Sequence, residues 1–207
     1  MSDQENDNST KRIVLFGGTF DPIHLGHITP VVEACTEIKA EQLIYLPCHI
    51  PPHKAMPRVT SDMRFEMTQL VAEQINNESP FDVSVSDFEL RQAQTSFTRY
   101  TVEHFAKLYP EHQLYFLVGM DSLLHFSKWY KWQEILGFCR LLVLQRPGYS
   151  FNPAMIEKDI LQNLHLSTAS EVNISSTELR SQLTNMKNIH CLPPSLIEYI
   201  KHHQLYL

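Results

Sequence analysis

The sequence lacks the features that mark several large classes of protein. No run of 18 apolar residues is present, so we expect no membrane span. Positive charge is not in excess: 17 Lys and Arg face 23 Asp and Glu, and the net charge of −6 argues against nucleic acid as the main partner. The four cysteines, at positions 35, 48, 139 and 191, contain no C-x-x-C pair. They fit reduced thiols, mostly in the core, of a cytoplasmic protein.

Two common phosphate-binding motifs are also missing. No Gly-Lys-Ser/Thr stands where a Walker loop would place it, and Gly17, Gly18 and Gly26 do not fit G-x-G-x-x-G. The first ten residues are polar and acidic, without the apolar segment of a signal peptide, and we expect a disordered tail over residues 1–11. Residues 12–207 suffice for a single domain, because the chain is 43% hydrophobic.

One stretch, residues 17–27 with the sequence GGTFDPIHLGH, organises the rest of the chain. The apolar run at 13–16 before it has the length and branching of a buried strand, and helical spacing of apolar residues continues to about Ile38. The segment therefore predicts a strand, a glycine turn and a helix start. Free backbone N–H groups and the positive end of the helix dipole meet at such a turn, which suits an anion such as phosphate.

Two histidines lie three residues apart in this stretch. His24 and His27 can point the same way at a helix start and hydrogen-bond phosphate oxygens. A metal site is the alternative, but no third Cys, His or carboxylate lies nearby in register. We therefore expect no metal bound by protein side chains.

Strand-like and helix-like segments alternate along the whole chain. This order predicts a single α/β domain, with a mostly parallel, Rossmann-like sheet and helices on both faces. Ligands of such sheets bind where the strand order reverses, and the strands before Gly17 and Gly119 are the candidates for the two sides of that crevice. The expected strands cover residues 13–16, 43–46, 81–86, 114–118, 141–144 and 164–166, and the expected helices 27–38, 61–77, 96–109, 151–163 and 193–203.

Polar groups follow several of these strands, and each has two interpretations. His53 and Lys54 end a proline-rich loop that either clamps a phosphate or is a solvated surface. Asp121 either contacts a ribose or a cation or caps a helix, and Arg146 lies just past the next strand. Whether Arg64 reaches the site or is solvated, the sequence does not decide.

The roles of three later segments are also left open by the sequence. Trp129 either packs in the core, as large aromatic rings usually do, or stacks on a flat aromatic ligand. Ser96 or Thr98 is a natural helix cap. Residues 174–180, Ile-Ser-Ser-Thr-Glu-Leu-Arg, read as a capping box or as a second anion site at a helix start.

The stretch at 17–27 contains the H-x-G-H motif of the nucleotidyltransferase superfamily, and its longer form resembles the bacterial nicotinate-nucleotide adenylyltransferases. Four later segments resemble this family's motifs in the expected order. These are P-x-x-x-P-P-H-K at 47–54, S-F-T at 96–98, G-M-D-S at 119–122 and I-S-S-T-E-L-R at 174–180. Phe97 replaces the family's Tyr, and Leu179 replaces its Ile. The resemblance covers residues 12–207, so it implies one nucleotidyltransferase domain.

The resemblance implies transfer of AMP from ATP, with Mg²⁺, to nicotinate mononucleotide. It assigns catalysis to His24, His27 and Arg180, and ATP binding to Gly17, Gly18, Thr19, Phe20, Gly26, Gly119, Asp121, Ile174, Ser175 and Ser176. It assigns the mononucleotide to His53, Lys54, Thr98, Asp121, Trp129, Tyr130 and Arg146. Nicotinamide mononucleotide or 4′-phosphopantetheine as acceptor, and a nucleotide-sensing module without turnover, are the alternatives. The oligomeric state stays open.

Overall fold

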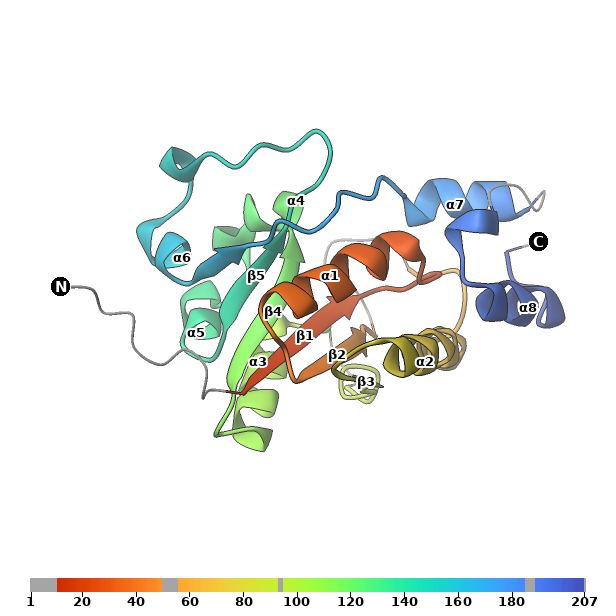
Figure 1. Cartoon of the computed structure of the whole chain (residues 1–207), viewed down its shortest axis with the longest axis horizontal. Helices are drawn as coiled ribbons and strands as arrows, with labels where there is room; N and C mark the ends of the chain where they lie inside the picture. Colours follow the sequence, from red (N-terminus) through yellow and green to blue (C-terminus); the bar gives the residue numbers. More distant parts are fainter. Residues whose placement is uncertain (1–10, 50–55, 93–94, 185–188, 207) are drawn as a thin grey trace.

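The computed structural model describes residues 11–49, 56–92, 95–184 and 189–206 and has a six-stranded sheet at its centre (Figure 1). The expected tail, apart from its last residue, lies outside these ranges. All strand pairs are parallel, in the order β3-β2-β1-β4-β5-β6. Each predicted apolar run is a strand: β1 Arg12–Gly18, β2 Gln42–Pro47, β3 Asp82–Val85, β4 Gln113–Gly119, β5 Arg140–Leu144 and β6 Leu164–Leu166.

Helices cover both faces of this sheet, as predicted. Because successive side chains of a strand point to opposite faces, Val14 and Phe16 of β1 join one apolar core while Ile13 and Leu15 join the other. The first core takes side chains from α1 Thr29–Glu37, α2 Ser61–Glu78, α7 Ser176–Leu183 and α8 Pro194–His202. The second takes them from α3 Thr98–Leu108, α4 Met120–Leu123, α5 Trp132–Leu136 and α6 Lys158–Gln162.

The strand order reverses between β1 and β4, because β2 and β3 extend the sheet on one side and β5 and β6 on the other. Leu15 of β1 pairs with Phe116 of β4, so the two strands end close together. The predicted crevice between the strands before Gly17 and Gly119 is therefore confirmed. Within the described part of the chain, no helix has the length and apolarity needed to cross a bilayer.

One helix prediction is wrong. Residues 151–163 form two short helices, the 3₁₀ turn Pro153–Met155 and α6, in place of one continuous helix. Ile156 between them is extended and buried against the second core. Packing of this side chain overrides the helical tendency of the segment.

Thr60 caps α2 by accepting a hydrogen bond from the Met63 N–H. Two capping predictions, for α3 and α7, fail. Neither Ser96 nor Thr98 caps α3, and the Ser96 hydroxyl accepts from the His49 N–H instead (3.1 Å). The start of α7 has no side-chain cap either. At two of these helix starts, a serine makes a long-range contact beside the crevice instead of a local one.

Candidate functional site

The turn after β1 closes tightly around a phenylalanine ring. A Cβ at position 18 would lie 2.5 Å from an edge atom of Phe20, so only glycine fits. Phe20 itself has a positive φ of 50°, and its ring packs edge-on against Phe16 and Tyr45 in the core. The buried ring anchors the turn, and any ligand contact of Phe20 is left to its backbone.

The two histidines of the turn stack on one another. Their ring centroids are 3.8 Å apart with the planes at 24°, and the His24 side chain is buried. A Cβ at Gly26 would lie 3.0 Å from the His24 ring, so this glycine allows the ring to lie against the backbone. The pair forms one face at the start of α1, where the sequence predicts that both rings point the same way.

His24 also reaches the segment 152 residues further on. Its Nε2 lies 3.0 Å from the Ser176 hydroxyl at the start of α7. The structure thus brings together two of the predicted anion-binding segments, 17–27 and 174–180. Burial and the nearby charge of Arg146 lower the pKa of His24 from 6.5 to about 4. The imidazole is therefore neutral at neutral pH, with one N–H donor and one acceptor.

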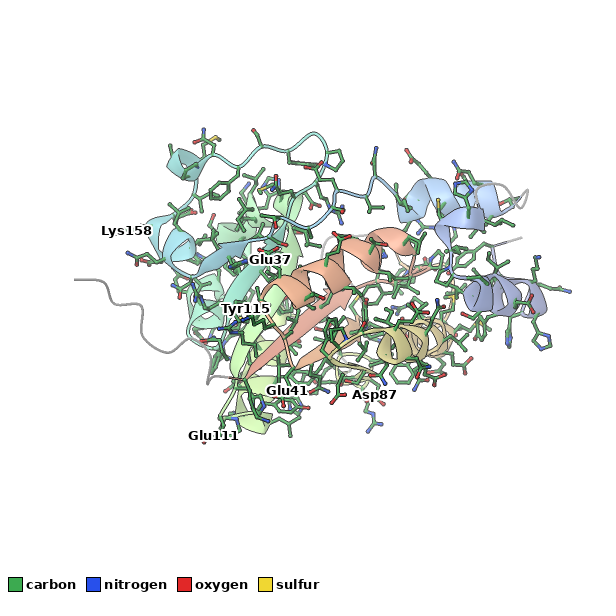
Figure 2. All side chains as sticks on the ribbon, in the orientation of Figure 1. Glu37, Glu41, Asp87, Glu111, Tyr115 and Lys158 are labelled. Atoms are coloured by element: carbon green, nitrogen blue, oxygen red, sulfur yellow. The ribbon has the colours of Figure 1, made fainter. Side chains whose placement is uncertain are left out.

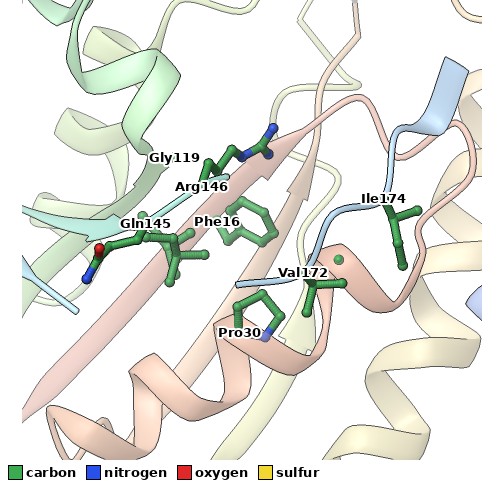
Figure 3. Close-up of a pocket in the computed structure, with 10 residues that line it drawn as sticks. Phe16, Pro30, Gly119, Gln145, Arg146, Val172 and Ile174 are labelled. Carbon is green, nitrogen blue, oxygen red and sulfur yellow. The ribbon is translucent and has the colours of Figure 1, made fainter. Parts of the chain in front are cut away.

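A pocket opens where the strand order reverses (Figure 3). It contains four of the predicted site residues, Gly26, Gly119, Arg146 and Ile174. The other walls of the pocket could not be predicted from the sequence, because they are ordinary apolar or amide side chains outside any motif. These walls are Phe16, Pro30, Leu117, Leu144, Gln145 and Val172. Their common signal is position: most lie at the carboxyl ends of β1, β4 and β5 or just before α7.

Asp121 and Arg146 approach one another at the edge of this pocket. Arg146 Nε lies 3.5 Å from Asp121 Oδ1, and both side chains are about half exposed. A Cβ at Gly119 would lie 2.5 Å from the same carboxylate oxygen and 2.8 Å from the same nitrogen. That oxygen is buried and accepts no hydrogen bond within the described ranges. The pair therefore presents one unused acceptor and one cation to a ligand.

Arg180 does not line this pocket. Its Nη1 donates to the backbone carbonyl of Asp21 (2.7 Å), and its Nη2 donates to the Thr177 hydroxyl (3.1 Å). The guanidinium is thus fixed between the turn after β1 and the first turn of α7. Its Nε is buried and has no acceptor in the described part of the chain.

Three of the predicted mononucleotide residues, Thr98, Trp129 and Tyr130, lie in a second region, at the start of α3 and in the α4–α5 connection. Trp129 is partly buried, its ring 5.2 Å from Phe126 and edge-on to Phe116 at 6.2 Å. Tyr130 is exposed and packs against Phe97 at 5.0 Å. Thr98 is the first residue of α3. His53 and Lys54 lie outside the described residues.

Arg64, which the sequence left undecided, is almost fully buried. Its guanidinium donates to the Thr19 carbonyl (2.7 Å) and lies 3.4 Å from the His49 carbonyl oxygen. It therefore holds the turn after β1 to the loop after β2. The sequence signal is weak, since Arg64 is only one residue from the apolar stripe of α2.

Two glutamates of α1 hold the segment that leads into α7. Glu37 accepts from the Ser167 hydroxyl (2.8 Å) and the Thr168 N–H (2.9 Å), and it lies beside β6 in Figure 2. Glu33 accepts from the Ser170 N–H (2.6 Å). Because α1 begins just after His27, these contacts tie the segment that leads to Ile174 and Ser176 to the helix that directly follows the histidine pair.

The described residues contain no group of three or more His, Cys, Asp or Glu side chains that could hold a metal ion. Near the pocket, Asp121 supplies a single carboxylate.

Comparison with known proteins finds a matching family model, relatives in sequence and a solved structure with the same fold. The cytidylyltransferase-like family model matches residues 15–182. A protein of Shewanella pealeana named "Probable nicotinate-nucleotide adenylyltransferase" is 37% identical over 94% of this chain and 95% of its own length. A protein of the same name from Idiomarina loihiensis is 34% identical over 93% of this chain and 98% of its own length. The Plasmodium falciparum nicotinic acid mononucleotide adenylyltransferase, solved with APC and with NaAD, has the same fold. Its TM-score is 0.73 at 20% sequence identity, and the match covers 95% of this chain and 97% of that chain.

The low pKa of His24 predicts a pH-dependent stability. As pH falls from 6.5 towards 4, the unfolded chain takes up a proton at this histidine before the folded chain does. The free energy of unfolding therefore falls across this window, by at most ~3 kcal/mol from this group. Urea unfolding of wild type and His24→Gln at pH 6.5 and 4.5 measures the effect, and the variant should lose less stability than wild type.

The exposed His125 supplies the matched control, because it is not among the residues that line the pocket. His125→Gln should lose as much stability as wild type between the two pH values. Equal losses in wild type and His24→Gln would contradict the buried, neutral state of His24.

Proposed function

Because the chain belongs to the cytidylyltransferase-like family, and within it to the nicotinate-nucleotide adenylyltransferases, we propose that it transfers AMP from ATP to nicotinate mononucleotide. The products are nicotinate adenine dinucleotide, an intermediate of NAD biosynthesis, and pyrophosphate. One observation carries the assignment of the site: the 3.0 Å contact of His24 with Ser176, which joins two helix starts beside a pocket at the point where the strand order reverses.

The reaction needs no general base from the protein. The phosphate of the mononucleotide is already an anion at neutral pH, and one of its oxygens attacks the α-phosphorus of ATP. The bond from this phosphorus to the bridging oxygen breaks, and pyrophosphate leaves with its electron pair. The protein must bring two anions together in line and stabilise the charge on the transferred group.

We assign this stabilisation to the histidine pair and Ser176. A neutral His24 donates one ring N–H, and Ser176 donates its hydroxyl, to oxygens of the α- and β-phosphates. An arriving phosphate would raise the pKa of His24, since a negative charge favours the protonated ring. His27, stacked at 3.8 Å, supports the ring and offers a second imidazole to the same phosphates.

The remaining assignments follow from position. Arg180, with its unused buried Nε, binds the outer phosphates of ATP, together with the N–H groups at the start of α7. The unused oxygen of Asp121 accepts from a ribose hydroxyl, and Arg146 beside it faces a phosphate. The phosphates can come close to the main chain of the turn after β1, at Gly17, Gly18, Thr19 and Phe20.

Mg²⁺ fits this scheme as a companion of ATP. We propose that it enters bound to the phosphates, as part of the substrate, near the Asp121 carboxylate, which lies 3.5 Å from Arg146 of the pocket lining. When bound, the ion offsets charge on the phosphates.

Trp129 and its neighbours are the proposed pyridine subsite. The ring of Trp129 stacks on the nicotinate, and backbone N–H groups near Thr98 and Tyr130 face its carboxylate. N–H donors that converge on one point suit two carboxylate oxygens and oppose the NH₂ of an amide. We therefore propose selection for nicotinate over nicotinamide mononucleotide.

Pyrophosphate release from ATP, measured with each mononucleotide and with 4′-phosphopantetheine, tests the function. Turnover with nicotinate mononucleotide supports it. Turnover with another acceptor alone would reassign the substrate. Binding of ATP without turnover of any acceptor would indicate a nucleotide-sensing module.

His24→Ala should lower kcat/KM by a factor of about 100 or more, the loss typical when a donor that stabilises transition-state charge is removed. The melting temperature should change little, because the ring belongs to neither apolar core. His125→Ala, a variant of an exposed histidine, is the matched control and should keep wild-type kcat/KM. A His24→Ala protein that is less stable but fully active per folded molecule would mark the histidine as structural.

Wild type should prefer nicotinate over nicotinamide mononucleotide by a factor of about 10 to 100, since one mispaired polar group costs ~1–3 kcal/mol. Trp129→Ala should weaken both acceptors and leave their ratio mostly intact, because stacking does not read the substituent. The measurement is kcat/KM for both acceptors on both proteins.

Trp132→Ala is the control, since Trp132 is also partly buried and also packs against Phe126. It should leave acceptor affinity near wild type. Equal kcat/KM for the two acceptors on wild type would refute the substrate assignment. A collapsed ratio in Trp129→Ala would refute the division of roles.

A further inference from the structure

Asp21 is a buried carboxylate at the centre of the turn after β1. Only 3% of its surface is exposed, and its three oxygens accept hydrogen bonds from three distant parts of the chain. Oδ1 accepts from the Tyr206 hydroxyl (2.7 Å) and Oδ2 from the Arg58 N–H (2.8 Å). Its backbone carbonyl accepts from Arg180 Nη1 (2.7 Å). The proposed function uses Arg180 but gives no role to Tyr206.

Tyr206 lies in the turn after α8 and is held in place at both ends. Its backbone carbonyl accepts from the Thr184 hydroxyl just after α7 (3.2 Å), while its ring is buried in the first core. Burial and the neighbouring Asp21 raise the pKa of its phenol well above the ordinary 10. The hydroxyl therefore stays protonated and donates to Asp21 throughout the working pH range.

The hydrogen bond from Tyr206 determines where the Asp21 carboxylate can point. Oδ2 lies 3.7 Å from Arg180 Nη1, slightly too far for a hydrogen bond. Without the phenol, Oδ1 would be a buried acceptor with no donor. Arg180 already lies at ion-pair distance from the carboxylate, so the carboxylate would turn towards the guanidinium and form a hydrogen bond with it.

We propose that Tyr206 is a positioning residue for adenylyl transfer. By holding Asp21 Oδ1, it keeps the carboxylate at ion-pair distance (3.7 Å) and out of a direct hydrogen bond with Arg180, so the guanidinium remains bound to the Asp21 carbonyl and keeps its Nε for the phosphates of ATP. This inference rests on the proposed function, in which Arg180 binds the outer phosphates.

Tyr206→Phe tests the proposal without removing the buried ring. We expect kcat/KM for ATP to fall about tenfold, the loss expected when one buried hydrogen bond is left unmade, while KM for the mononucleotide stays unchanged. Tyr199→Phe is the matched control: it removes a hydroxyl from α8 that donates to Glu66, away from the turn after β1. This control should keep wild-type kinetics.

A double-mutant cycle separates positioning from simple stability. In an Arg180→Ala background, Tyr206→Phe should cause little further loss, because the group through which it acts is gone. If the losses multiply, or if Tyr206→Phe lowers the affinity for both substrates alike with a lowered melting temperature, the proposal is overturned. Wild-type kinetics in Tyr206→Phe would also overturn it.

Calorimetry with a non-hydrolysable ATP analogue measures ATP-site affinity without turnover. It therefore distinguishes failure of the positioning role of Tyr206 from failure of the proposed function. If wild type binds the analogue but turns over no mononucleotide, the function fails, and weaker binding by Tyr206→Phe than by Tyr199→Phe still supports the positioning role. Equal affinities in the two variants, or no binding to wild type, would overturn that role.

Discussion

The contact between His24 and Ser176 is the interaction on which the site depends. It joins the turn between β1 and α1 to the start of α7 across 152 residues, beside the pocket between β1 and β4. Strand order alone opens a crevice there, but it does not bring a second helix start to that place. Glu33 and Glu37 do so, because they hold the chain after β6 against α1. The proposed ATP site is thus a product of tertiary contacts made by one helix.

The sheet and the first turn could be predicted because their signals are local. Short apolar runs such as 114–118 specify buried strands whatever surrounds them, and Gly18 is required by a ring only two residues away. The pairing of segments 17–27 and 174–180 was expected from family resemblance and not from spacing. The residues alone predict a helix start for each of the two segments, but they do not predict that the two segments lie together.

The contacts that could not be predicted are polar and distant in sequence. Ser96 reads as a helix cap, yet it accepts from the His49 N–H on another loop. Arg64 reads as a possible surface residue beside an apolar stripe, yet it is buried against the Thr19 carbonyl. Pro30 and Val172 line the pocket without belonging to any motif. In each example the contact partner is far away in the sequence and is brought close by the packing of the whole fold. A local sequence pattern therefore does not predict it.

Two arginines, the buried Arg64 and the partly buried Arg180, explain how the turn after β1 can favour an anion. Arg64 binds the carbonyl of Thr19, and Arg180 binds the carbonyl of Asp21. The carbonyl and amide of a trans peptide point in opposite directions, so fixing the Thr19 carbonyl on Arg64 directs the Phe20 N–H away from that arginine. Pro22 has no N–H, and its peptide contributes only the carbonyl that Arg180 already binds. The arginines thus bind two acceptors of the turn that would otherwise oppose a phosphate, and they add positive charge behind it.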